Sequence, residues 1–291
     1  MAGAVGRSVG SRRWRMRERL ALTTLTLPAL PADGVVSAHG YSLFKHGDAR
    51  LARVYGRALG ALWLQGVDLR EVSSLCVTAS GFGAVAPAAY SLVRPFAQWV
   101  RAAVPVSTFE VRRRGISAGD YAQMTPGARK VAVSSSCMQV DGGLDLRGAR
   151  VVALDDIRVT GTHEQAMDEC LTAAGAAAVD HLYLVDAHAF ADEPTVESRL
   201  NLAAVPDVDA LLRVVERRSF VPNARVCRRV MQLPVTQLER FVAGAPEPVL
   251  GWMLRAVELD RLERVGPYRA GVTAFRELTA ALDGPAQTAT A

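Results

Sequence analysis

Hydrophobic residues recur along the chain with two different spacings. In residues 48–65 apolar side chains recur at helical intervals, and Asp48 stands where a helix N-cap accepts backbone N–H groups. Residues 149–154, by contrast, form an unbroken apolar run with two adjacent valines, which is typical of a strand buried on both faces. The sequence therefore predicts a helix over 48–65 and a buried strand over 149–154.

Strand-like and helix-like segments alternate through the middle of the chain. Helices are expected from about Ala86 and over 164–176. Further strands are predicted over 74–78, 105–111 and 181–185. This alternation is typical of a parallel sheet flanked by helices, so we expect an α/β domain over residues 41–190.

The remaining segments differ from the middle of the chain in their composition and in the spacing of their apolar residues. Residues 1–40 are predicted to be a basic disordered tail and linker, and the polar segment 115–147 a long functional loop. Residues 191–283 carry helical runs separated by Pro or Gly, which predicts a helical C-terminal part. Residues 284–291 are expected to be a disordered tail.

Positive charge is concentrated at one end of the 291-residue chain. Residues 1–19 hold six arginines against one glutamate, which accounts for the whole net charge of +5. The neutral remainder argues against a nucleic-acid-binding face. No apolar run reaches the roughly 18 residues of a membrane helix, and the four cysteines are scattered. We therefore expect a cytoplasmic protein; a twin-arginine export signal around Arg12 and Arg13 is the weaker alternative.

The chemistry is concentrated in residues 151–164. A buried strand leads to Asp155 and Asp156, and ligands of parallel sheets bind at the carboxyl edge of the strands. The turn 160–162 then enters a helix, and Gly161 lets its backbone turn tightly. Helix N-terminal N–H groups and threonine hydroxyls bind phosphate. The segment suits a ligand with a phosphate at one end and hydroxyls or a hydrated Mg²⁺ at the other, such as a ribose 5-phosphate.

Four apolar residues, two acidic residues and a TG-containing loop resemble the motif by which type I phosphoribosyltransferases bind phosphoribosyl pyrophosphate (PRPP). The resemblance implies that Asp155 and Asp156 hold the ribose hydroxyls and act in catalysis, with Mg²⁺ brought near them by PRPP. It also implies that the 5-phosphate lies in the loop formed by Val159, Thr160, Gly161, Thr162 and His163.

Two more segments stand where that family has its pyrophosphate-binding groups. Ser80, Gly81 and Phe82 follow an earlier strand, in the place of the family's small pyrophosphate loop. Arg112 and Arg113 follow the next strand, where basic residues contact pyrophosphate in the family. The resemblance therefore implies that Arg112 binds pyrophosphate and that Arg113 acts in catalysis.

A narrower likeness rests on residues 41–48, 155–164 and 222–225. These resemble a bacterial subfamily of phosphoribosyltransferases that is associated with tellurite-resistance-type stress gene clusters. Val159 departs from the purine-specific members, which often have an aspartate there as base toward the nucleobase, and His163 replaces the common Thr or Ser. The resemblance therefore does not carry over a purine acceptor.

Three functions remain open. The first is a phosphoribosyltransferase that transfers the phosphoribosyl group of PRPP to a nucleobase-like or other small acceptor, with a homodimer left open. The second is a PRPP-sensing regulatory protein on the same fold, without turnover. A PRPP-synthetase-like enzyme ranks last, because the sequence has no second synthetase-like half.

Overall fold

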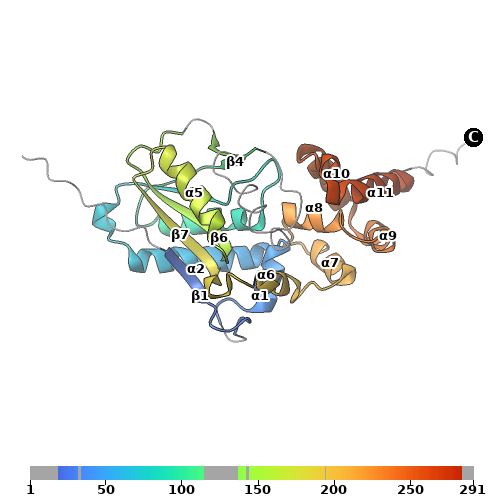
Figure 1. Cartoon of the computed structure of the whole chain (residues 1–291), viewed down its shortest axis with the longest axis horizontal. Coiled ribbons are helices and arrows are strands. Elements are labelled where there is room, and N and C mark those ends of the chain that lie inside the picture. Colours follow the sequence, from blue (N-terminus) through green and yellow to red (C-terminus); the bar gives the residue numbers. More distant parts are fainter. Residues whose placement is uncertain (1–18, 32–33, 115–136, 142–143, 194, 284–291) are drawn as a thin grey trace, which may run out of the picture.

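The structure, a computed structural model, describes residues 19–31, 34–114, 137–141, 144–193 and 195–283. Within these ranges, an α/β domain with a central parallel sheet lies beside a group of C-terminal helices (Figure 1). The expected α/β class and the helical C-terminal segment are both confirmed.

The central sheet forms because its middle strands are apolar on both faces. β6 (Arg150–Arg158) and β7 (Ala178–Asp186) are buried along most of their length, as expected of strands covered by helices on both sides. The five strands lie in the order β1-β7-β6-β2-β3, and every neighbouring pair runs parallel. The other three are β1 (Arg19–Thr24), β2 (Leu75–Ala79) and β3 (Val106–Thr108).

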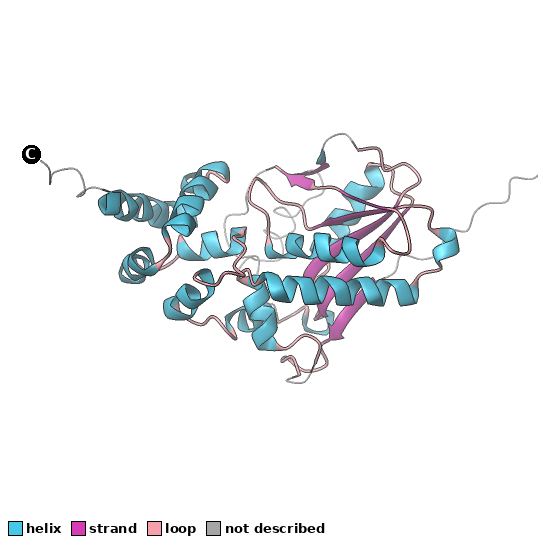
Figure 2. Ribbon diagram, turned by 180° about the vertical axis from the view of Figure 1, so that it is seen from behind, coloured by secondary structure: helices cyan, strands magenta, loops and turns pink. Residues whose placement is uncertain are grey.

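Helices cover the two faces of this sheet. α2 (Ala49–Gly66) and α3 (Val93–Val100) pack on one face, and α5 (Thr162–Ala173) packs on the other (Figures 1 and 2). α2 begins as predicted, because the Asp48 carboxylate accepts the N–H groups of Arg50 and Leu51. Short 3₁₀ helices occupy Leu69–Glu71, Ala88–Leu92, His188–Phe190 and Leu262–Arg264.

The N-terminal tail and linker predicted over residues 1–40 must be corrected in two places. β1 is an edge strand of the sheet, paired with β7 from Arg19 opposite His181 onward. α1 (Ala38–Lys45) begins inside the predicted linker, where the Ser37 hydroxyl accepts the N–H of Gly40. The half-buried β1 gave only a weak apolar signal, and pairing with β7 decides its conformation.

The strand predicted over 105–111 divides into two strands. β3 ends at Thr108, and β4 (Val111–Arg113) leaves the parallel sheet to pair antiparallel with β5 (Met138–Val140). Between them Phe109 turns into the core on the α5 face, together with Val111. The break carries β4 to the carboxyl end of β2.

The C-terminal helices have a core of their own, in which Leu211, Phe241, Met253 and Phe275 are fully buried. Four helices match the predicted runs: α7 (Val208–Val215), α9 (Val235–Gly244), α10 (Glu247–Leu259) and α11 (Gly266–Asp283). α6 (Thr195–Leu202) and α8 (Ala224–Val230) were not predicted, because their apolar stripes are short. Among the described helices, none is long and apolar enough to cross a membrane.

Candidate functional site

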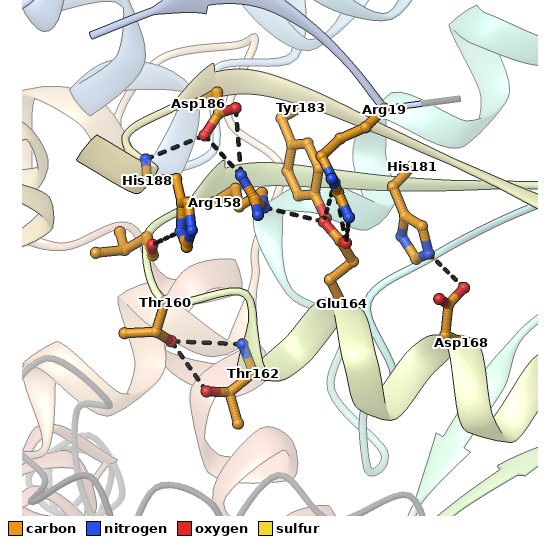
Figure 3. Close-up of polar contacts among 11 residues, drawn as sticks. Arg19, Arg158, Thr160, Thr162, Glu164, Asp168, His181, Tyr183, Asp186 and His188 are labelled. Atoms are coloured by element: carbon orange, nitrogen blue, oxygen red, sulfur yellow. Dashed lines mark hydrogen bonds and ion pairs between the residues drawn. The ribbon is translucent and has the colours of Figure 1, made fainter. Parts of the chain in front are cut away.

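The turn between β6 and α5 has the backbone of an anion site. Gly161 stands at the N-cap of α5 with φ +75°, in the left-handed region that favours glycine. Beside it the hydroxyls of Thr160 and Thr162 lie 3.1 Å apart (Figure 3). First-turn N–H groups, the positive end of the helix dipole and two hydroxyls therefore meet at one place, which is the arrangement that binds phosphate.

Glu164 is the acidic residue in the first turn of α5, and it is neutralised by its neighbours. Its carboxylate accepts from Arg19 Nε at 3.0 Å and from the Tyr183 hydroxyl at 2.8 Å, and lies 3.0 Å from Arg158 Nε (Figure 3). Burial opposes its charge, but these partners outweigh burial and lower the pKa of Glu164. The negative charge nearest the cradle is thus balanced by two arginines.

A histidine fixes the start of the cradle. His188 Nδ1 lies 2.9 Å from the carbonyl oxygen of Val159 and donates to it, while the His188 N–H donates to Asp186 at 3.0 Å (Figure 3). Asp186 in turn lies 3.4 Å from a terminal nitrogen of Arg158. The loop that follows β6 is therefore tied to the loop that follows β7.

Asp155 and Asp156 lie within β6, because the strand continues to Arg158 rather than ending at residue 154. Successive side chains of a strand point to opposite faces, and Val151 and Ala153 pack on the α5 side while Val152 and Leu154 pack on the α2 side. Asp155 therefore faces α5 and Asp156 faces α1 and α2. The strand is thus longer than the predicted 149–154, and the two adjacent carboxylates point to opposite faces of the sheet.

Asp155 faces the cradle. Its carboxylate accepts from the Ser80 hydroxyl at 2.7 Å and lies 3.8 Å from His163 Nε2. Burial raises the pKa of Asp155, and the hydrogen bond from Ser80 opposes that rise. Asp155, Ser80 and His163 thus line one small cavity at the carboxyl end of the sheet.

His163 is neutral at physiological pH. Burial, together with the nearby charge of Arg113, lowers the pKa of His163 to about 4. Its Nε2 atom is buried and has no hydrogen-bond partner among the described residues. A neutral imidazole with an unsatisfied ring nitrogen can hydrogen-bond a ligand oxygen or hydroxyl.

The segment after β2 and the start of β4 form one unit. The Phe82 N–H donates to the Val111 carbonyl at 3.1 Å, and the Arg113 N–H donates back to the Phe82 carbonyl at 2.8 Å. At Gly81 a Cβ would come within 3.2 Å of Val111 Cγ1, so a larger residue would push the two segments apart. The predicted pyrophosphate loop and the predicted basic residues are therefore brought together.

The two arginines of β4 have different surroundings. Arg112 stacks on the Phe82 ring at 5.1 Å and forms ion pairs with Glu110 at 2.5 Å and Asp141 at 3.0 Å. Burial lowers the pKa of Arg113 to about 10, and the like charge of Arg228 adds to that effect. Arg113 is thus the arginine nearer to the cradle, since its charge also reaches His163.

Asp156 has partners that sequence reasoning missed. Its carboxylate forms an ion pair with Lys45 at the end of α1, and Glu197 of α6 lies 3.6 Å from the same ammonium. Asn223 Nδ2 donates to the Lys45 carbonyl at 3.5 Å. The one signal was the narrower likeness, whose segments 41–48 and 222–225 meet here. The polar segment 115–147, predicted to be a long functional loop, lies mostly outside the described residues.

Comparisons with known proteins give one family and a distant set of structures. A family model described as PRTase (phosphoribosyltransferase) ComF-like matches residues 33–254. No curated protein matches the chain.

Hypoxanthine phosphoribosyltransferase from Staphylococcus aureus is 14% identical over 46% of this chain and 62% of its own, with a TM-score of 0.29. Hypoxanthine phosphoribosyltransferase from Trypanosoma cruzi is 11% identical over 48% of this chain and 67% of its own, with a TM-score of 0.33. A purine phosphoribosyltransferase from Pyrococcus horikoshii is 14% identical over 45% of this chain and 79% of its own, with a TM-score of 0.26. This chain thus spans less than two thirds of the staphylococcal protein.

Proposed function

Because the chain belongs to the ComF-like phosphoribosyltransferase family, we propose that it binds PRPP and transfers the phosphoribosyl group to a small, nucleobase-like acceptor, releasing pyrophosphate. One observation carries the proposal. The Asp155 carboxylate lies 3.8 Å from His163, in the first turn of a helix that opens at a left-handed glycine. A carboxylate for a sugar hydroxyl thus lies beside a cradle for the phosphate of the same sugar.

In this proposal the 5-phosphate lies against Thr160, Thr162 and the first N–H groups of α5. Asp155 accepts a ribose hydroxyl in place of its bond from Ser80, and His163 Nε2 bonds a second ligand atom. Asp156 accepts the neighbouring hydroxyl from the other side of β6.

Transfer breaks the bond between the anomeric carbon and the pyrophosphate oxygen while the acceptor bonds to that carbon. Negative charge grows on the leaving pyrophosphate, and a fixed cation stabilises it. We assign this role to Arg113, because its charge reaches His163 beside the cradle. The loop 80–82 is hydrogen-bonded to β4 and therefore lies beside Arg113.

The described residues do not form a metal site of their own. No group of three His, Cys, Asp or Glu side chains in the described chain is arranged to hold an ion, and the two aspartates lie on opposite faces of β6. We propose that Mg²⁺ reaches the site bound to the diphosphate of PRPP and lies near Asp155 and Asp156.

A PRPP sensor is the second candidate, and Val159 favours it. Val159 is 9% exposed and apolar, so the cradle has no acid at the position that serves some relatives as base toward a nucleobase. An acceptor that needs no base would still react, whereas a sensor would bind PRPP without turnover. A role in a stress gene cluster, a cytoplasmic location and a homodimer stay predictions.

The test combines turnover with binding. The protein is incubated with Mg²⁺, PRPP and a pooled nucleobase panel, and pyrophosphate is assayed beside calorimetric PRPP binding. We expect Asp155→Asn to weaken PRPP binding by about tenfold or more, because the amide replaces a charged acceptor. Asp145→Asn, in an exposed pair with Arg147, is the matched control.

Each outcome of that test separates the candidates. Acceptor-dependent pyrophosphate release supports the transferase, and PRPP binding without release under any acceptor supports the sensor. Normal PRPP binding by Asp155→Asn would mean that the ribose site has been assigned to the wrong residue.

A further inference from the structure

A buried network of charges lies on the face of β6 that is turned away from α5. Lys45 Nζ pairs with Asp156 and lies 3.6 Å from Glu197 Oε1, and the side chains of Lys45 and Asp156 are only 9% and 10% exposed. The positive charge of Arg225, at the start of α8, acts on both Lys45 and Glu197. The network therefore joins α1, α6 and α8 to the strand that carries the acidic pair.

The cation of this network is a lysine, which is a rare residue in this chain. Of its 34 basic residues only Lys45 and Lys130 are lysines, and the others are arginines. A lysine ammonium is a compact point charge, whereas the guanidinium of arginine is a broad planar fork. The ammonium of Lys45 fits between Asp156 and Glu197 and lies 5.8 Å from the centre of the Tyr41 ring.

Lys45 stays charged in spite of its burial. Burial alone would lower the pKa of Lys45, but attraction to Asp156 and Glu197 outweighs burial and raises it. A buried ion pair costs desolvation and is weak evidence for stability, so its presence beside a candidate ligand group points to function.

The charge of Asp156 is finely balanced. Burial raises the pKa of Asp156, Lys45 opposes the rise, and the negative charges of Asp155 and Glu197 add to it; the balance lies at a pKa of about 6. Tyr41 of α1 and His163 of α5 are also titratable groups within reach of the Asp156 charge. Asp156 is therefore ionised at neutral pH by a narrow margin that depends on Lys45.

We propose that Lys45 is a positioning residue for the PRPP site, which holds the Asp156 carboxylate charged and in place to accept a ribose hydroxyl. The charges of Glu197 and Arg225 act on Lys45, so α6 and α8 contribute to the electrostatic environment of the ribose site. The inference rests on the proposed function, because it assigns Asp156 to the ribose.

Lys45→Met tests the role of the ammonium, because methionine has a similar length and no charge. Without the cation Asp156 holds its proton more tightly, and PRPP binding then requires a higher pH. A rise of the pKa from about 6 to about 8 would leave about one tenth of Asp156 ionised at neutral pH and weaken PRPP binding about tenfold. The measurement is the PRPP dissociation constant from about pH 5 to about pH 9.

Glu197→Gln should have the opposite effect on the same profile. Glu197 adds negative charge near Asp156, so its removal lowers the pKa of Asp156 and moves the midpoint of PRPP binding to lower pH. A role confined to packing would shift neither midpoint, or would weaken binding equally at every pH. Shifts of the pH midpoint in opposite directions in the two variants would therefore show that Lys45 and Glu197 act through their charges.

Arg70→Met is the control, because it breaks an exposed ion pair with Asp68 far from the sheet edge and should leave the profile unchanged. Should Lys45→Met fail to fold, the Glu197→Gln variant tests the role of Lys45 by itself. A lower pH midpoint of PRPP binding in Glu197→Gln supports the inference, and an unchanged or higher midpoint overturns it. If the wild-type chain binds PRPP and neither variant shifts the pH midpoint of binding, only the inference is overturned. A wild-type chain that binds no PRPP at any pH overturns the proposed function and the inference together.

Discussion

At the scale of single residues, two adjacent aspartates have different roles because a strand separates their side chains. Asp155 accepts from Ser80 beside the cradle, whereas Asp156 pairs with Lys45 on the opposite face. One aspartate therefore contacts a neutral hydroxyl donor, and the other contacts a cation. The sequence predicted that both carboxylates hold ribose hydroxyls, but the fold places them in two different environments.

Gly161→Ala tests the left-handed turn. A Cβ at Gly161 would meet nothing closer than Arg158 at 3.8 Å, so the substitution adds backbone strain without a clash. We expect a loss of about 1–2 kcal/mol in the free energy of unfolding, measured with urea, together with weaker PRPP binding. Gly161→Asn is the matched variant, since asparagine tolerates the left-handed region and should lose less. Equal losses in both variants would contradict the role of φ.

At the scale of elements, β1 contributes a cation as well as a sheet edge. Its first residue, Arg19, reaches Glu164 in the first turn of α5, so the edge strand adjusts the charge around the phosphate cradle. The Arg19 side chain is half exposed, and an exposed ion pair adds little stability. Its effect should therefore appear in anion binding rather than in stability.

Arg19→Met should weaken PRPP binding roughly two- to fivefold at low salt, because Glu164 is then less well balanced, and the loss should shrink as salt rises. The free energy of unfolding should change by less than about 1 kcal/mol. Tyr183→Phe removes a neutral hydrogen bond to the same carboxylate and should leave the salt dependence as in the wild type. Calorimetry at two salt concentrations measures both, and a salt-independent loss in Arg19→Met would disprove the charge argument.

At the scale of the whole molecule, the C-terminal helices are tied to the segment that follows the pyrophosphate loop. Asp260, after the end of α10, accepts the N–H groups of Ala84 at 3.0 Å and Val85 at 3.1 Å, and lies 3.5 Å from Arg228. Val85 packs into the core of these helices. The C-terminal helices are therefore connected to the proposed ligand site both here and through the Lys45 network.

Asp260→Asn should loosen that connection, because the amide loses the charge that two N–H groups and Arg228 share. Asp260 is 4% exposed, so we expect a loss of about 1–3 kcal/mol in the free energy of unfolding and weaker pyrophosphate binding. Urea unfolding and calorimetry with pyrophosphate measure the two effects. Asp209→Asn, which breaks an exposed pair with Arg240, should change stability by less than about 0.5 kcal/mol.

The sequence alone determined the features that depend on local pattern. The apolar run before Asp155, the glycine of the turn and the Asp48 cap predicted a central strand, an α5 N-terminus and the start of α2, and all three are present. These features follow from side-chain periodicity and backbone preference, which act over a few neighbouring residues.

Only the tertiary structure decided which distant residues meet. The length of β6 placed the two aspartates on opposite faces, pairing with β7 made a strand of residues 19–24, and packing brought Lys45 to Asp156 across 111 positions. Weakly patterned segments such as β1 take their structure from partners far away in the chain, and one residue more or less in a strand reverses the face of a side chain. Such contacts leave no local pattern in the sequence, so the charge environment of the proposed ligand site became visible only in the fold.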